Sequence, residues 1–337
     1  MAGDGISCHI CGKMCNIYVK GRILIMAAFI DKEIHTATAE YSTNFWNAMR
    51  CRKHNFDVLK KATDLGTGCT MLPVKDSLQM EAVIGKESVF RNLASVVTFY
   101  GGASTIFAHD CNELAAWVPE GAAIPLQDAK EDFSRFPVSA HKLAVFVKID
   151  EDFANDSTFG IETYLTNRIA KNFAKAEDEA FLLGTGEDKP TGILSPDKGA
   201  EIGATTKSLS YDDIIKLYFS VKEEYRRKGA WLMNDRTALS LLSLKDERGT
   251  YLWNMNDHTL LGKPVVIMDA MPNIETGNSP VLFGDFHYYW VIRRSPVHIR
   301  TLREKFVLYN QIGYLAIEYM DGKLIRRDTV KALKVTE

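Results

Sequence analysis

The most informative segment of the chain is Glu177-Asp178-Glu179-Ala180-Phe181-Leu182-Leu183-Gly184-Thr185-Gly186, followed by Pro190-Thr191-Gly192-Ile193-Leu194. Apolar residues recur at spacings of four and three up to this point, at Ile161, Leu165, Ile169, Phe173, Ala176, Ala180 and Leu183. This periodicity predicts one amphipathic helix of about six turns, roughly 35 Å long. Residues 156–158 offer side chains that can cap its start, and Gly184 is typical of a left-handed glycine at a helix end.

Two features of this stretch have an alternative, chemical interpretation. Gly184-Thr185-Gly186 resembles a phosphate loop, but such loops lie between a strand and the start of a helix, and this one follows a helix. The acidic run Glu177-Asp178-Glu179 has the residue types of a metal site, but consecutive helical residues point about 100° apart and do not converge. We therefore interpret the glycines as a helix stop with a turn, and the acidic run as a solvated face.

The residues before this helix predict a hairpin. Leu143, Val145, Val147 and Ile149 alternate with residues of the opposite face, which is typical of a strand with one apolar side. The loop-rich stretch 117–137 precedes it, and we expect the two to form a long hairpin. Because an isolated hairpin is marginal in water, it needs another surface to lie on. The polar helical segment 31–65 also has too few apolar residues for a core of its own and needs a neighbour.

The residues after the helix mix helices and strands. A helix is expected over 211–228, with a capping box from Ser210 and Asp213 and a stop at Gly229, and another after Asn234. Asp321-Gly322 is expected to be a hairpin turn. The expected strands are 230–233, 264–268, 281–286, 289–293, 307–319 and 323–334. The fold class is therefore α+β.

Charge and cysteine content exclude several classes of protein. The 337 residues have a formal net charge of −2, so a basic surface built to grip nucleic acid is absent. All six cysteines lie before residue 112, so most of the fold does not depend on disulfides and a reducing cytoplasm is expected. Cys8, Cys11 and Cys15 have partial zinc-ligand spacing, but a closed site needs a fourth ligand from His9, Cys51 or His54. An incidental leader is the alternative, and no metal or other cofactor is expected.

Catalytic and membrane-spanning motifs are also missing from the sequence. It has no His-Glu-x-x-His, no Gly-x-Ser-x-Gly and no Gly-Lys-Ser/Thr, and its eight histidines include no pair at i,i+4. The apolar run Ile23 to Ile30 is too short to span a bilayer and lacks a cleavage site before Asp31. We expect neither an enzyme nor a membrane protein.

The opening stretch and its Pro-x-Gly-Ile continuation resemble the signature of tailed-bacteriophage major capsid proteins, which have the Hong Kong 97 (HK97) fold. Further motifs of that family occur in order over residues 45–337. They are Gly66-Thr67-Gly68 with Leu72-Pro73, Phe90-Arg91-Asn92-Leu93-Ala94, Trp117-Val118-Pro119-Glu120-Gly121, Trp231-Leu232-Met233-Asn234 with Leu244-Lys245-Asp246, Leu261-Gly262-Lys263-Pro264-Val265, and Leu282-Phe283-Gly284-Asp285-Phe286.

The resemblance implies a division of the chain into the parts of that fold. The expected parts are a leader of doubtful status at 1–25, an N-terminal arm at 26–65, the first part of the P-domain at 66–116, an extended loop (E-loop) at 117–150, the spine helix of the P-domain at 151–195, an A-domain at 196–314, and C-terminal strands returning towards the P-domain at 315–337. Gly184, Gly186, Pro190 and Gly192 form the turn that marks the fold.

The resemblance also implies function and partners. The chain is expected to assemble with itself into pentamers and hexamers of an icosahedral shell, inside the bacterial host cytoplasm, and to end in the virion. A scaffold protein, a portal and packaged double-stranded DNA held by proximity are the other expected partners. Contacts between subunits are expected at Trp117, Glu120, Lys130, Phe133 and Phe136. The alternatives are an encapsulin-like bacterial nanocompartment shell of the same fold and a soluble α+β enzyme.

Overall fold

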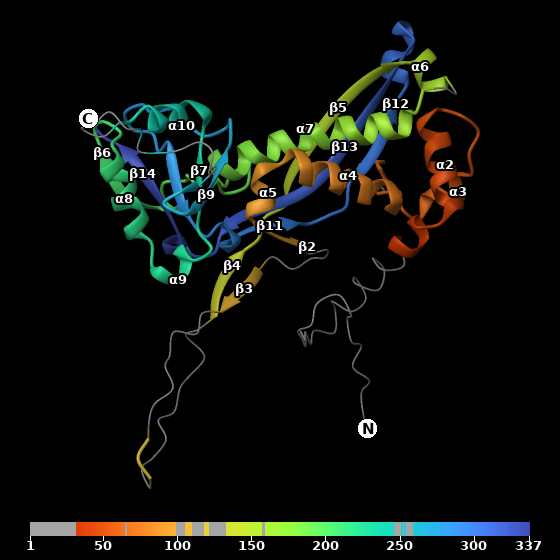
Figure 1. Cartoon of the computed structure of the whole chain (residues 1–337). Helices are drawn as coiled ribbons and strands as arrows, with labels where there is room; N and C mark the ends of the chain where they lie inside the picture. The colour runs from red at the N-terminus through yellow and green to blue at the C-terminus, as the bar shows by residue number, and fades with distance from the viewer. Residues whose placement is uncertain are drawn as a thin grey trace.

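The computed structural model describes residues 32–64, 66–98, 105–109, 118–120, 133–156, 159–245, 251, 253 and 259–337. One long helix, α7 (Ile161–Leu183), lies along a first β-sheet, and its last turn reaches a second sheet (Figure 1). The Cys8, Cys11 and Cys15 hypothesis, the leader and the start of the arm fall outside the described residues. No helix within these ranges is long and apolar enough to cross a membrane.

Helix α7 ends where the sequence predicts, but its start and its buried face differ from the prediction. Gly160 is the N-cap and no side chain caps the helix, so the predicted capping by residues 156–158 is wrong. Ala176 is exposed and Leu183 is 50% exposed, although both were assigned to the apolar stripe. The buried face instead follows two rows at a spacing of four: Ile161, Leu165, Ile169, Phe173, Glu177 and Phe181, and beside them Thr166, Ala170, Ala174, Asp178 and Leu182.

The first sheet forms the body beneath α7. Its strands are β1 (Thr70–Met71), β2 (Ser95–Thr98), β5 (His141–Asp150), β11 (Tyr289–Arg293), β12 (His298–Leu302) and β13 (Gln311–Leu324). Strand β13 continues through Asp321-Gly322, so the predicted hairpin turn there is wrong. Both residues instead pair with β11, at Ile292 and Val291. Tertiary pairing overrides the local turn preference of the dipeptide.

The hairpin is built from other strands than the sequence predicts. Strand β5 is antiparallel to β13 over ten residues and belongs to the body. The hairpin consists of β3 (Thr105–His109) and β4 (Phe133–Pro137), which we call the ribbon. The expected pairing of 117–137 with 142–150 is therefore wrong. The alternation that predicted β5 is correct, because its apolar side chains face α7 and the core.

The second sheet has the order β6-β14-β10-β7-β9-β8 and carries three helices. The predicted helix over 211–228 breaks in two at Val221, which is buried and has extended backbone, while its Ser210–Asp213 capping box is confirmed. The elements are β6 (Glu201–Thr206), α8 (Tyr211–Ser220), α9 (Glu223–Arg226), β7 (Ala230–Met233), α10 (Asp235–Leu242), β8 (Thr259–Leu260), β9 (Lys263–Ile267), β10 (Val281–Gly284) and β14 (Val330–Val335).

The two sheets do not follow the residue ranges expected for the parts of the chain. Strands β11, β12 and most of the region 289–314 belong to the first sheet, not with the rest of 196–314. The last strand, β14, lies in the second sheet, so of the two C-terminal strands only β13 belongs to the body beneath α7. The remaining elements are α4 (Val74–Glu87), α5 (Val89–Leu93), α6 (Glu151–Asn155), and the short 3-10 helices η2 (Phe286–Tyr288), η3 (Glu304–Tyr309) and η4 (Arg327–Thr329).

The first described helices pack on the body of their own chain. Helices α2 (Ala39–Met49) and α3 (Phe56–Lys60) bury their apolar residues in the same core as α7, β5 and β13. The Tyr314 hydroxyl donates to the carbonyl of Met49 at 3.1 Å, and the Trp46 indole donates to the Asp76 carboxylate at 2.9 Å. The neighbour that residues 32–64 need is therefore the rest of the same subunit.

Candidate assembly site

The turn after α7 folds back on the last turn of that helix. The backbone N–H groups of Ile193 and Leu194 donate to the carbonyls of Phe181 and Leu182 at 2.8 and 3.0 Å. These carbonyls have no partner within an α-helix, so the returning chain takes the place of a cap. This turn is buried at Gly184 and at residues 190–193 but exposed at residues 187–189, and it joins α7 to the segment that leads into the second sheet.

Three positions of this turn require glycine. At two of them another backbone segment lies too close for a side chain, and at the third the backbone angle φ is positive. A Cβ on Gly184 or Gly192 would lie less than 3.0 Å from backbone atoms of the facing chain. Gly186 has φ +86°, a conformation that L side chains rarely adopt. Gly184 itself has φ −64°, so the predicted left-handed helix end is wrong. The fold-marker glycines are therefore explained by packing of two backbones.

Two of the three acidic residues before the turn are buried, which overturns the prediction of a solvated face. Glu177 accepts two hydrogen bonds from the Arg91 guanidinium, at 2.6 and 2.9 Å. Asp178 accepts from the Ser88 hydroxyl at 2.6 Å and from the backbone N–H groups of Val89 and Phe90 at 3.0 and 3.2 Å. Both carboxylates therefore hold helix α5 against α7.

A second buried ion pair lies near the first. The Arg293 guanidinium on β11 donates to Glu318 on β13 at 2.9 Å and also pairs with Glu81 on α4. Burial raises the pKa of Glu177 to about 7, with the Arg91 and Arg293 charges opposing the rise and the Glu318 charge adding to it. The two pairs thus form one charged cluster beneath α7, and this cluster ties α4, α5 and α7 to the sheet.

The raised pKa predicts a pH dependence of stability. Native Glu177 holds its proton more tightly than unfolded Glu177, so its contribution to the free energy of unfolding falls as pH rises from 4.5 to about 7. The slope is at most about 1.4 kcal/mol per pH unit for one proton. We expect Glu177→Gln to flatten this slope, as measured by urea unfolding of the unassembled subunit across that window. The exposed neighbour Glu179 is the control, because Glu179→Gln leaves the slope in place. A wild-type slope in Glu177→Gln contradicts the prediction.

The ribbon is anchored to the body at one end. Ile106 of β3 and Val138, just after β4, pack with Ile292 of β11 in a small apolar cluster of their own. The backbone N–H of Ser139 donates to the buried carboxylate of Asp321 at 2.7 Å, and the Lys323 ammonium donates to the carbonyl of Pro137. The body therefore holds the base of the ribbon by both apolar and polar contacts.

The predicted contact residues are only partly within the described chain. Trp117 and Lys130 lie outside the described residues, as does the side chain of Phe133. Glu120 is exposed. Phe136 packs against the cluster at the ribbon base, on its own chain.

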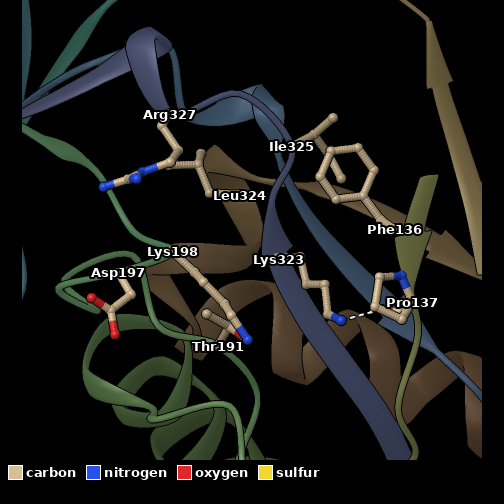
Figure 2. A pocket seen from close by; sticks show the side chains of 9 residues that line it. All are labelled: Phe136, Pro137, Thr191, Asp197, Lys198, Lys323, Leu324, Ile325 and Arg327. Carbon is tan, nitrogen blue, oxygen red and sulfur yellow. Dashed lines mark hydrogen bonds between the residues drawn. The ribbon is translucent and has the colours of Figure 1, made fainter. Parts of the chain in front are cut away.

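A pocket of about 320 Å³ opens beside the ribbon base (Figure 2). Its apolar wall comes from Phe136, Leu324 and Ile325, and its remaining lining comes from Pro137, Thr191, Asp197, Lys198, Lys323 and Arg327. Thr191 belongs to the fold-marker turn, so ribbon, turn and C-terminal segment meet here. No sequence pattern predicted this pocket, because its residues come from three distant segments. Among the described residues no group of three or more histidine, cysteine or acidic side chains is placed to hold a metal ion.

Comparison with known proteins identifies the relatives of this chain. The model of the phage capsid family matches residues 75–335, well over half of the chain. No curated protein sequence matches it. The capsid of an empty GTA particle, computed with C5 symmetry, is 29% identical with a TM-score of 0.63, over 74% of this chain and 90% of that chain. The capsid of the native GTA particle is also 29% identical, with a TM-score of 0.61 over the same shares.

More distant structures share the fold. The matching chain of Gordonia phage Cozz is 14% identical with a TM-score of 0.54, over 74% of this chain and 87% of that chain. These matches are to phage and GTA capsids, so the nanocompartment alternative is not favoured, and family and fold are those of a structural protein of the virion shell. With its long helix α7, its glycine turn and its HK97-like fold, the chain belongs to the phage capsid family, that of the tailed-phage major capsid proteins.

Proposed function

We propose that this major capsid protein builds its shell from pentamers and hexamers through segments that leave the compact body, chiefly the loop carried by the ribbon. The observation that carries the proposal is the ribbon itself. It is anchored at its base by Ile106, Val138 and Ile292, while Phe107 on the same strand is 55% exposed. A two-stranded ribbon is marginal in water, so its exposed face needs a partner.

The arrangement suits assembly by many weak contacts. A ribbon that leaves one subunit and lies on the next gives the two subunits a second contact, in addition to the contact between their bodies. Linked contacts of this kind add through high effective concentration without any single strong interface. We propose that Trp117, Glu120, Lys130, Phe133 and Phe136 contribute to these contacts, and that the parts of the chain act as N-terminal arm, E-loop, P-domain and A-domain.

The remaining partners follow from the same proposal. The shell encloses the double-stranded DNA of a tailed phage or prophage, and the net charge of −2 suits a container that does not adhere to its contents. A separate scaffold protein and a portal complete assembly in the host cytoplasm. The subunit is non-catalytic.

The proposal is tested by assembly of the purified chain, with scaffold where needed. We expect pentamers, hexamers or closed particles of megadalton size in electron micrographs. A monodisperse monomer at micromolar concentration that does not respond to scaffold contradicts the proposal.

A shortened loop tests the role of the ribbon. Residues 110–132 are replaced by Asn-Gly, which closes β3 and β4 with a two-residue turn. Val138 and Phe136 stay in place, because both contact the body. We expect a subunit with unchanged thermal unfolding that no longer forms particles, as shown by sedimentation and electron microscopy. Normal particles from this variant place the inter-subunit contact elsewhere.

A further inference from the structure

The dipeptide Asp321-Gly322, which local sequence predicts to be a hairpin turn, joins three parts of the molecule. The carboxylate of Asp321 accepts from the backbone N–H of Ser139, just after the ribbon, at 2.7 Å. The carbonyl of Gly322 accepts from the backbone N–H of Thr191, in the turn after α7, at 3.0 Å. Both residues of the dipeptide also pair with β11. The base of the ribbon is therefore held at the same place as the turn that leads into the second sheet.

The Asp321 carboxylate meets donors on both of its oxygens. Oδ2 accepts from Ser139 and lies 3.5 Å from the Lys323 ammonium. Oδ1 accepts from the backbone N–H of Gly322 at 2.8 Å and lies 3.6 Å from Nε2 of His141. Each oxygen thus has one backbone N–H and one basic side chain beside it. A carboxylate fits this place and an amide does not, because the NH2 group of an amide donates and would face one of the two N–H groups.

Lys323 holds the ribbon at a second point. Its ammonium donates to the carbonyl of Pro137, the last residue of β4 (Figure 2). Asp321 and Lys323 together contact positions 137, 139 and 141, alternate residues of the segment that leads from the ribbon into β5. The Asp321 side chain is fully buried and that of Lys323 is 17% exposed. A carboxylate so far from water needs a positive partner, since breaking a buried pair is strongly destabilising.

We propose that Asp321 is the positioning residue of the ribbon, an inference that rests on the proposed assembly function. Its carboxylate, neutralised by Lys323 and by protonated His141, fixes the direction in which the ribbon leaves the body. Subunits with this contact present their ribbons at one angle, and that angle sets the geometry of the shell. Without the contact the base of the ribbon opens locally, while α7 and the sheets keep their own apolar cores.

The first experiment removes the cation and keeps the carboxylate. Lys323→Met has an unbranched apolar side chain in place of the lysine, and amide hydrogen exchange of the unassembled full chain is measured by mass spectrometry at about pH 8. We expect residues 138–141 to lose protection by about tenfold or more, as for the loss of one hydrogen bond to a charged group, and α7 to keep its protection. The matched control is Lys263→Met, because Lys263 also donates to a backbone carbonyl, that of Arg227, in the second sheet.

A pH profile distinguishes a positioning charge from a merely structural contact. The titratable side chains placed against Asp321 are Lys323 on β13, His141 on β5 and Tyr289 on β11. Burial and the Asp321 charge hold the pKa of Tyr289 well above its ordinary value, so this hydroxyl stays neutral. Histidine gains its charge as pH falls from about 8 to 5. In Lys323→Met we therefore expect the protection of residues 138–141, corrected for the intrinsic exchange rate, to return over this range. With His141→Gln added, it does not return.

The diameter of the particles tests the consequence for assembly. Asp321→Asn places an amide NH2 group against a backbone N–H, so we expect a wider spread of particle diameters than in the wild type, as measured in electron micrographs. The matched control is Asp150→Asn, because Asp150 is an exposed carboxylate at the other end of the same strand pair, β5 and β13. We expect particles of wild-type diameter from this control.

Several outcomes overturn the inference and leave the assembly function intact. They are wild-type protection of residues 138–141 in Lys323→Met, an equal loss in Lys263→Met, a loss that spreads equally through α7, and no return of protection at low pH. Particles of wild-type uniformity from Asp321→Asn also overturn it. Failure of the unaltered chain to form any particle is distinct, because it overturns the assembly function while the exchange result in the unassembled subunit still stands.

Discussion

Gly184→Ala is expected to lower the free energy of unfolding by about 4 kcal/mol, enough to leave little folded subunit. A Cβ at this position would lie less than 3.0 Å from the carbonyl oxygens of Pro190 and Ala180. Both are backbone atoms of the turn and of the helix end, so neither can rotate away as a side chain does. Relief requires the turn to separate from the helix, which breaks the hydrogen bonds from Ile193 and Leu194 to the last helical turn. The measurement is urea unfolding followed by circular dichroism.

The matched control is Gly85→Ala within helix α4. Nothing lies within 4 Å of a Cβ at this position. Alanine is favoured over glycine in a helix interior by about 0.5–1 kcal/mol, so this variant is expected to be slightly more stable than the wild type. Equal stability of the two alanine variants contradicts the explanation by backbone contact.

Arg91→Ala is expected to lower the free energy of unfolding by about 3–5 kcal/mol, because it leaves Glu177 buried without its partner. The Glu177 side chain is fully buried and that of Arg91 is 7% exposed, so water cannot replace the lost guanidinium. The loss of the positive charge raises the pKa of Glu177 further. We therefore expect the destabilisation to be smaller at low pH, where Glu177 is protonated, and this is measured by urea unfolding at several pH values.

Replacing both partners distinguishes the net contribution of the ion pair to stability from the cost of leaving one buried charge unpaired. The double variant Arg91→Met with Glu177→Met is expected to recover most of the lost stability, since an apolar pair of similar size avoids the cost of burying charge. The exposed pair Arg227–Glu223, with side chains 77% and 74% exposed, is the control. Arg227→Ala is expected to change stability by less than about 0.5 kcal/mol. A loss of similar size in Arg91→Ala and Arg227→Ala contradicts the proposed role of burial.

The candidate site was only partly predictable from sequence. The glycine turn could be found, because its motif is contiguous and its residues need unusual backbone proximity. The pocket could not, since Phe136, Lys198 and Ile325 are brought together only by the meeting of ribbon, turn and C-terminal segment. The hairpin was placed one strand too late along the chain, because alternation marks β5 as a strand without saying which strand it pairs with.

The long helix and its end at Gly184, the strand β7, the capping box at Ser210 and the α+β class can be predicted from local sequence, because they depend on residues close together in the chain. Which side chains of the helix are buried depends on packing between distant segments. Glu177 lies in the spacing-of-four row of buried residues, yet its charge made a solvated position the natural expectation. Its burial depends on Arg91, 86 residues earlier, whose guanidinium compensates the cost of removing the carboxylate from water.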